Sequence, residues 1–384
     1  MRNLYRDNDV AMEKPINTIF FQLLRCGLDS SERLPEIVSE DDWHKIYKTA
    51  QQQSLLGVVF YGLQRCEDIR MPKALLLNWY AQCEQIRRTN LQVNQAAVRL
   101  SEFLQEAGYA TCILKGQGNT LNYPDAYIRM SGDIDIWVMS KEHDTEQRIM
   151  DLIRLARKHT PAARPTYHHV DYGEFDGVEV ELHYRPSFMN NPMHNHRLQM
   201  WFESQAEVQF THHVNLPGGV GRVSVPTLSF NRIYQMAHIA HHILHEGIGL
   251  RQLTDYYLVL KGGFTEEERQ KDVLLLRYLG LYDMAGAVMY VLQKVFALKM
   301  EEMIVPMDER RGRFVLDEIL LAGNFGQYDR RMAHSNSRVS KNILRLKRDV
   351  RFLRYFPSEC LWEPVFRLWH FFWRVYYRWR TRRR

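Results

Sequence analysis

The sequence has few cysteines, and their arrangement suits neither cross-linking nor metal binding. Five cysteines are scattered over 384 residues, their number is odd, and no two have the CxxC spacing. Such a set indicates neither a disulfide framework nor a zinc knuckle. We therefore expect a protein of a reducing compartment, the cytoplasm.

Long hydrophobic runs are also absent from the sequence. A membrane-spanning helix needs roughly 18 uninterrupted apolar residues, whereas the apolar stretch at residues 16–24 is interrupted by Asn17, Thr18 and Gln22. The sequence therefore predicts no transmembrane segment and no signal peptide.

The chain holds enough apolar material for a folded core, and its charge is unevenly distributed. Hydrophobic residues make up 45% of the sequence and aromatic residues 12%, which suffices for one large core or two to three smaller ones. The net charge is +6, but residues 341–384 contain thirteen Lys or Arg and three acids, so they carry +10 and the rest of the chain −4. The basic character therefore belongs to the C-terminal segment.

Helical patterns precede and follow the middle of the chain. Ser39, followed by three acids, is typical of a helix N-cap with a first turn that favours negative charge. Residues 72–105 predict a long helix, or two in line, that ends near Gly108. From residue 228 onward the pattern is helical again.

A strand-rich island lies between these helical stretches. The patterns predict strands at residues 110–114, 133–138 and 178–184, a helical turn at 117–123, a helix at 143–158, and a hairpin of residues 207–214 and 221–225 around Pro217-Gly218-Gly219. Strict alternation in residues 178–184 gives one apolar face and one face that carries Glu179, Glu181 and His183.

These elements predict an α+β fold in which a small mixed β-sheet core is flanked by N-terminal and C-terminal helical regions. The expected boundaries are an N-terminal helical region at residues 1–108, the core with the mixed sheet at 109–226, a C-terminal helical region at 227–340 and a basic aromatic helical tail at 341–384.

Asp133 and Asp135 stand in the second predicted strand, alternating with Ile134 and Ile136. Side chains two apart on a strand share a face at about 7 Å, so the two carboxylates lie side by side while the isoleucines enter the core. Such carboxylates repel unless a cation lies between them, and hard divalent ions prefer oxygen ligands. A third acid from the strand with Glu179 and Glu181 would complete a two-metal site.

Glycines and basic residues lie upstream of this acid pair. Gly116 and Gly118 stand where a strand turns into a short helix, which lets backbone N–H groups approach a phosphate. Lys115 and Arg129 can neutralise further phosphate charge. For Arg129, an ion pair with Asp125 or Asp133 is an equally good interpretation. Together these residues predict a metal-bridged polyphosphate ligand.

The order of these pieces resembles a known family. A strand, Lys-Gly, a short helix, YPDAYIRMSGDIDIWV at residues 123–138 and VEVELHYRP at 178–186 are similar to the uncharacterised bacterial nucleotidyltransferase family of the polymerase-beta-like nucleotidyltransferase superfamily. The similarity extends to AHIAHHILHEGIGLRQLTDYYLVL at 237–260 and GNFG at 323–326, and covers most of residues 15–330.

The resemblance implies specific roles. Asp133 and Asp135 would bind two Mg²⁺ ions, and Glu181 would be the third ligand and the base that takes the proton of the attacking hydroxyl. Lys115, Gly116, Gly118 and Arg129 would face the triphosphate of an NTP donor. The sequence departs from the superfamily at one point, because Gln117 follows Gly116 where Gly or Ser is usual.

Four histidines recur at helical spacing, namely His238, His241, His242 and His245. Their i, i+4 pairs suit a transition metal, but no acid stands where an HExxH motif would have one. Contact with the nucleotide or acceptor and packing against the sheet are the other interpretations. Further along, Arg251 and Asp255 predict an intrahelical ion pair.

The basic tail also allows three interpretations. Between residues 352 and 379 it contains twelve aromatic residues interleaved with arginines. A helix of this kind can pack on the core with its arginines in water, lie on an anionic membrane surface, or bind RNA by stacking and phosphate contact. The second interpretation would place a cytoplasmic protein peripherally at the inner membrane face.

The functional hypothesis is Mg²⁺-dependent transfer of an NMP group from an NTP to an acceptor hydroxyl, with release of pyrophosphate. The sequence does not define the acceptor, which can be a protein, an RNA, a sugar or another small molecule. The alternative is a non-catalytic nucleotide-binding or protein-interaction module, such as an antitoxin-like protein or an envelope-associated regulator. The three acids favour the enzyme, whereas the Gly116-Gln117 turn favours the alternative.

Overall fold

The computed structural model describes residues 15–29, 38–66, 70–140, 145–329, 331 and 338–381. Its helices are α1 (Pro15–Leu28), α2 (Glu40–Gln52), α3 (Leu56–Gln64), α4 (Lys73–Glu106), α5 (Gln117–Thr120), α6 (Thr145–His159), α7 (Pro192–Thr211), α8 (Leu228–His245), α9 (Leu250–Lys261), α10 (Glu266–Tyr278), α11 (Tyr282–Phe296), α12 (Glu309–Ala322), α13 (Arg338–Leu353) and α14 (Pro357–Arg380). Its strands are β1 (Ala110–Ile113), β2 (Ile134–Met139), β3 (His169–Phe175), β4 (Val178–His183), β5 (His213–Asn215) and β6 (Arg222–Ser224).

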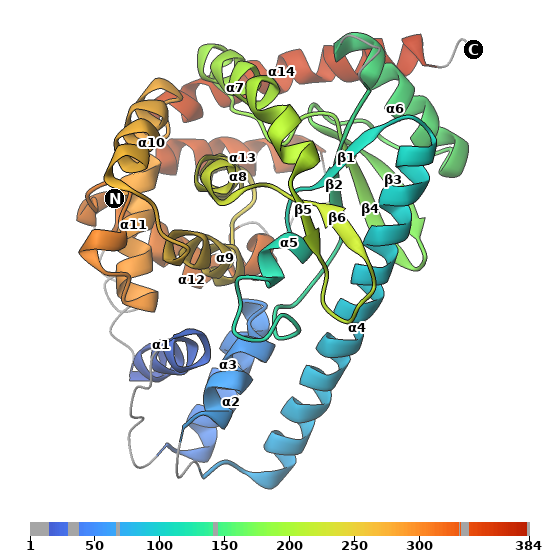
Figure 1. The fold of residues 1–384 in the computed structure, drawn as a ribbon. Helices are drawn as coiled ribbons and strands as arrows, with labels where there is room; N and C mark the ends of the chain where they lie inside the picture. Colours follow the sequence, from blue (N-terminus) through green and yellow to red (C-terminus); the bar gives the residue numbers. More distant parts are fainter. Residues whose placement is uncertain are drawn as a thin grey trace.

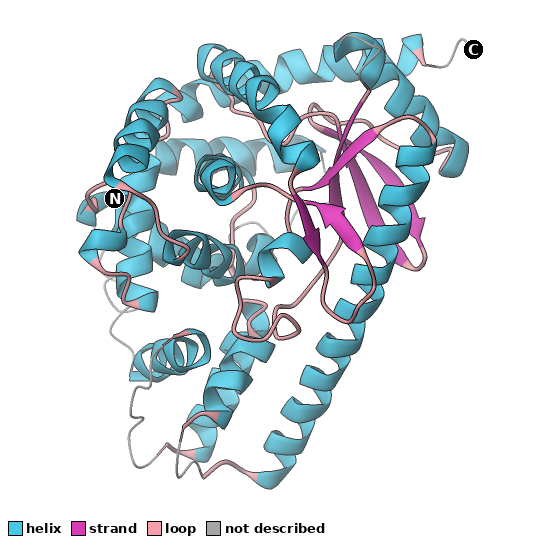
Figure 2. Ribbon diagram, viewed as in Figure 1, coloured by secondary structure: helices cyan, strands magenta, loops and turns pink. Residues whose placement is uncertain are grey.

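Four strands form a mixed sheet, in the order β1-β2-β4-β3. β2 pairs with β4 in parallel, whereas the two outer pairings are antiparallel. β5 and β6 form a separate hairpin. The strands gather in one part of the molecule and helices make up the rest (Figure 2), so the predicted α+β class is confirmed.

The long helix α4 connects the sheet with the N-terminal helices (Figure 1). Near its start, Trp79 is fully buried, packs against Tyr47 and Phe60, and donates its indole N–H to the carbonyl oxygen of Leu56 at 3.0 Å. Its later turns bury Val93, Ala96 and Ala97 in the cluster that covers one face of the sheet.

The two faces of β2 have different environments. Ile134 and Ile136 are fully buried in the cluster that α4 and α6 share with the sheet, as the alternation predicted. Asp135 and Trp137 alternate with them on the other face, and Trp137 packs against Phe230 of α8. The acidic face of β2 therefore lies toward the helical part of the protein, in which α8 is central (Figure 1).

Most predicted elements agree with the structure, but two assignments in the middle of the chain were wrong. The predicted strand at residues 207–214 is mostly the end of α7, which the side chain of Asn191 caps and Pro192 begins, and only residues from His213 onward form strand. Residues 166–177, to which no strand was assigned, contain β3, an edge strand whose register shifts between Asp171 and Gly173.

The tail is helical, as its spacing predicted, and one face of it packs on the core. Phe366, Trp369 and Trp373 surround the ring of Tyr167, and Tyr377 is buried against the sheet cluster. Trp362, nearer to the start of the helix, is by contrast 39% exposed. Residues 382–384 lie outside the described residues.

The other face of α14 is apolar and exposed. Large side chains recur every three or four residues along it: Leu361, Val365, Leu368, Phe372, Val375 and Trp379. No helix within the described residues combines the length and hydropathy that crossing a bilayer requires.

The burial of α4 predicts a measurable difference between two of its residues. Trp79→Ala should lower the free energy of unfolding by about 3–5 kcal/mol, because it removes a buried ring and leaves a cavity. Leu77→Ala, on the exposed side of the same helix, should change it by less than about 0.5 kcal/mol. Urea denaturation of both variants checks this, and equal losses would contradict the packing described.

Candidate active site

Parallel pairing of β2 and β4 brings two acids together. Asp135 pairs directly with Glu181 in the register of these strands. Asp133 immediately precedes β2, two residues from Asp135, and all three acids line one cavity. Glu179 pairs instead with Glu174 of β3, is exposed, and is absent from the lining of this cavity. Geometry therefore selects Glu181 over Glu179 as the acid nearest to the pair.

His183 lies between the two paired acids. Its Nε2 is 2.9 Å from Oδ1 of Asp135 and 3.2 Å from Oε2 of Glu181. Burial opposes the charged imidazole, but the two carboxylates outweigh it and raise the pKa of His183 to about 9. The alternation of residues 178–184 predicted His183 on the acidic face, but no pattern in the sequence assigned it a role.

Lys115 provides the second positive charge at the acids. Its Nζ is 3.0 Å from Oδ2 of Asp135 and 3.3 Å from Nε2 of His238. Burial opposes its charge, but Asp135, Asp133 and Glu181 raise the pKa of Lys115 above its ordinary value. Lys115 therefore stays charged and contacts the acid pair directly.

The three acids are not equivalent in charge. Burial opposes ionisation of Asp135, but Lys115 and His183 hold the pKa of this carboxyl well below its usual range. The negative charge of Asp135 is the main cause that raises the pKa of Asp133 to about 6. Asp133 is exposed at the cavity, so an added cation would relieve this repulsion.

The two glycines before β2 have different structural roles. Gly116 has φ +63°, a conformation that L side chains rarely adopt, and an added Cβ would come no closer than 4.0 Å to Nη1 of Arg129. A Cβ on Gly118 would lie 2.9 Å from Cγ1 of Val225, so this glycine allows close packing. Gln117 between them is buried.

Arg129 forms a buried ion pair with Asp255 of α9. Its Nε and Nη2 donate to the two carboxylate oxygens at 2.8 and 2.7 Å, and the hydroxyl of Tyr123 donates to Oδ1 at 2.7 Å. The predicted partners Asp125 and Asp133 are not the ones used, and Asp125 pairs with Arg87 instead.

This pairing also replaces the predicted intrahelical pair of Arg251 and Asp255. Arg251 donates from Nη1 to the carbonyl oxygen of Met130 at 2.8 Å. The bonds to Asp255 use the other two nitrogens of Arg129, and its Nη1 lies 4.0 Å from the position that a Cβ on Gly116 would take, at the cavity.

The cavity has a volume of about 290 Å³ and lies between the acidic face of the sheet and α8. His238, His241 and His242 line it, whereas His245 lines a neighbouring cavity with His241. Burial lowers the pKa of His238, His241 and His242, so these imidazoles are neutral. Three of the four predicted helix histidines therefore face the acids across the cavity.

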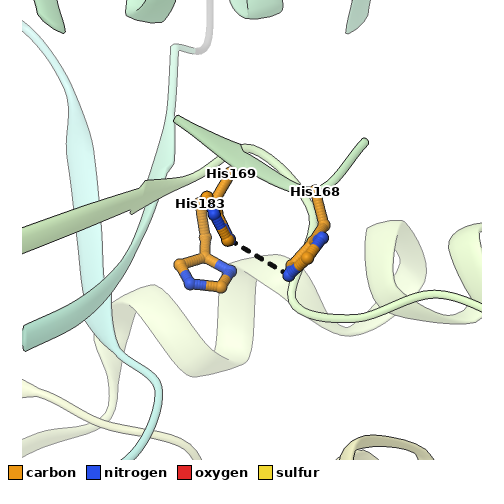
Figure 3. Close-up of side chains that lie close together, drawn as sticks. All are labelled: His168, His169 and His183. Atoms are coloured by element: carbon orange, nitrogen blue, oxygen red, sulfur yellow. Dashed lines mark hydrogen bonds between the residues drawn. The ribbon is translucent and has the colours of Figure 1, made fainter. Parts of the chain in front are cut away.

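Within the described residues, three clusters of His, Asp or Glu have potential metal-ligand atoms within 4.8 Å of one another, and none of these clusters includes a histidine of α8. They comprise Asp135, Glu181 and His183, then His169, Asp171 and Glu181, and then His168, His169 and His183 (Figure 3). Sequence reasoning missed His168 and His169, because the strand that they lead into was not predicted.

The fold and the site thus define a protein with a carboxylate-lined, partly basic cavity at one face of a small mixed sheet. A family model described as an uncharacterised nucleotidyltransferase matches residues 39–297, about two thirds of the chain. The chain belongs to this nucleotidyltransferase family, as the sequence motifs predicted. No curated protein and no solved structure matches it.

The Arg129–Asp255 pair predicts a large stability effect. Arg129→Met should lower the free energy of unfolding by about 3–5 kcal/mol, because it leaves a buried carboxylate without its cation. Arg99→Met breaks an exposed ion pair with Asp176, and it should cost less than about 1 kcal/mol. Chemical denaturation compares the two variants. A small loss of unfolding free energy for Arg129→Met would show that the fold tolerates a buried Asp255 without its cation.

Proposed function

We propose that this protein transfers an NMP group from an NTP to an acceptor hydroxyl, with Mg²⁺ as the cofactor and pyrophosphate as the leaving group. The observation that carries this proposal is the register of Asp135 with Glu181, beside Asp133, at the cavity of a chain in a nucleotidyltransferase family. Three carboxylates are hard oxygen ligands, which fits Mg²⁺.

The ligands would be Asp133, Asp135 and Glu181, and the proposal includes two Mg²⁺ ions. When bound, the ions neutralise triphosphate charge and lower the pKa of the attacking hydroxyl. Lys115 contacts Asp135 and can also face an anion, because its side chain is 20% exposed at the cavity. Arg129 and Gly116 line the same cavity and would face the same triphosphate.

The proposed reaction has a simple atomic balance. The acceptor oxygen forms a bond to the α-phosphorus, and the bond from this phosphorus to the bridging oxygen of pyrophosphate breaks. Glu181 takes the proton of the acceptor hydroxyl. Its side chain is 31% exposed, so it is reachable from the cavity. The acceptor can be a protein, an RNA, a sugar or another small molecule.

The carboxylates predict the outcome of neutral substitutions. Asp133→Asn and Asp135→Asn should each slow transfer by about 100-fold or more, equivalent to about 3 kcal/mol, because each removes a negative ligand. Glu181→Gln should have a similar effect. Release of pyrophosphate and transfer of label from an NTP labelled in its α-phosphate measure the rates.

Glu179→Gln is the matched control on the same face of β4, and it should leave the rate within about twofold of the wild-type rate. Full activity of the Asp133/Asp135 double variant would refute the site. A folded protein that binds nucleotide without any transfer would instead support the non-catalytic module.

We also propose that the exposed stripe of α14, defined by Leu361, Val365, Leu368, Phe372, Val375 and Trp379, lies on an anionic membrane surface. Its apolar side chains are 45–63% exposed, and Arg374, Arg378 and Arg380 are exposed on the same helix. Apolar side chains suit the boundary of the acyl chains, and arginines suit anionic headgroups. RNA binding would instead rely on bases that stack on aromatic rings. A stripe that is mostly aliphatic suits this less well than it suits a membrane surface.

Vesicle binding tests this surface. Wild-type protein should sediment with phosphatidylglycerol or cardiolipin vesicles and not with phosphatidylcholine vesicles, and added salt should release it, since each basic contact contributes about 1 kcal/mol. Leu368→Glu/Phe372→Glu should abolish binding, whereas Leu274→Glu on α10, also exposed, should not. Retention of RNA without vesicle binding would select the nucleic-acid interpretation instead.

A further inference from the structure

Two histidines that the proposed transfer reaction does not use lie beside the acids. His168 immediately precedes edge strand β3 and His169 begins it, while His183 ends β4 (Figure 3). Nδ1 of His169 is 3.0 Å from Nε2 of His168 and 3.1 Å from Oε2 of Glu181. The same Glu181 oxygen is 3.2 Å from Nε2 of His183. Ligand atoms of the three histidines lie within 4.8 Å of one another, and the Glu181 oxygen contacts two of these residues.

Three of the separations among these four atoms are close to those in a metal coordination shell. A tetrahedral ion with bonds of 2.0–2.1 Å to nitrogen or oxygen holds its ligand atoms about 3.3 Å apart. The separations at this cluster are 3.0, 3.1 and 3.2 Å. These three contacts therefore already have the spacing that a bound cation requires.

The outer ring nitrogens already have partners that orient the rings. Nδ1 of His183 is 3.2 Å from the carbonyl oxygen of Arg185, which can only accept a hydrogen bond, so this nitrogen carries a proton. Nε2 of His169 is 3.5 Å from the carboxylate of Asp171, and Nδ1 of His168 is 3.4 Å from Oγ1 of Thr166. Such outer contacts are typical of metal-binding histidines, because they direct the other nitrogen toward the ion.

We propose that His168, His169, His183 and Glu181 form a binding site for one Zn²⁺ ion, adjacent to the carboxylate site for Mg²⁺, in which the zinc takes the place of the Nε2 proton of His183. Imidazole nitrogen suits zinc, whereas magnesium prefers an all-oxygen shell. The zinc would be bound by both β3 and β4, so it would fix the edge strand and hold the Glu181 carboxylate in place. The two sites share Glu181, but zinc binding does not depend on nucleotidyl transfer.

Competition with a chromophoric zinc indicator tests the site on the full-length protein after treatment with a chelator. Wild-type protein should bind one Zn²⁺ more tightly than the indicator, even in millimolar Mg²⁺. His168→Ala and His169→Ala should each weaken this binding by more than about 100-fold, because loss of an outer-shell partner alone costs 10- to 100-fold. His196→Ala, an exposed histidine of α7, should leave it unchanged.

Three results would overturn the proposal. They are no zinc binding by wild type, displacement of zinc by Mg²⁺, and retention of zinc by His168→Ala and His169→Ala. If an alanine variant does not fold, as judged by circular dichroism, the corresponding glutamine variant replaces it in the titration. Asp133→Asn separates the two proposals, because this variant should lose nucleotidyl transfer but still bind zinc. Failure of one proposal therefore leaves the other intact.

Discussion

The pairing of β2 with β4 in parallel is the constraint on which the rest of the site depends. It places Asp135 directly opposite Glu181, with Asp133 two residues away, and so concentrates negative charge at one face of the sheet. Carboxylates on directly paired strand residues raise each other's pKa unless positive charge compensates them. Lys115 and His183 provide that charge from the protein itself, one from the turn after β1 and the other from β4. The architecture thus keeps an acidic site folded and still open to a cation.

Around this centre, the helical part of the protein shapes the cavity. α8 lines it with histidines that burial keeps neutral, so they add no charge, and His238 contacts Lys115. α9 anchors Arg129 through Asp255, which fixes the segment that leads into β2. The same arrangement leaves Nη1 of Arg129 out of the bonds to Asp255, on the side of Gly116. Interactions between the helices and the loop therefore determine which groups face a bound anion.

The sequence predicted β1, β2, β4 and the acidic face because their apolar alternation is local, and Ile134 and Ile136 are indeed buried. It missed β3, because Gly173 and the shift in register interrupt the alternation of Val170 and Tyr172. His168 and His169 were missed for the same reason. The partner of Arg129 is 126 residues away in the chain, so no local pattern could identify Asp255. Tail packing likewise depends on Tyr167, which lies far from α14 in the sequence.

We propose that the acid pair serves transfer of a nucleotidyl group rather than of a terminal phosphate. The most direct test incubates the protein with Mg²⁺, a lysate that supplies acceptors, and each of the four NTPs labelled either in the α-phosphate or in the γ-phosphate. We expect covalent label from the α-phosphate with one or more NTPs, none from the γ-phosphate, and release of pyrophosphate. Label from the γ-phosphate, or no label from any α-labelled NTP, would contradict it.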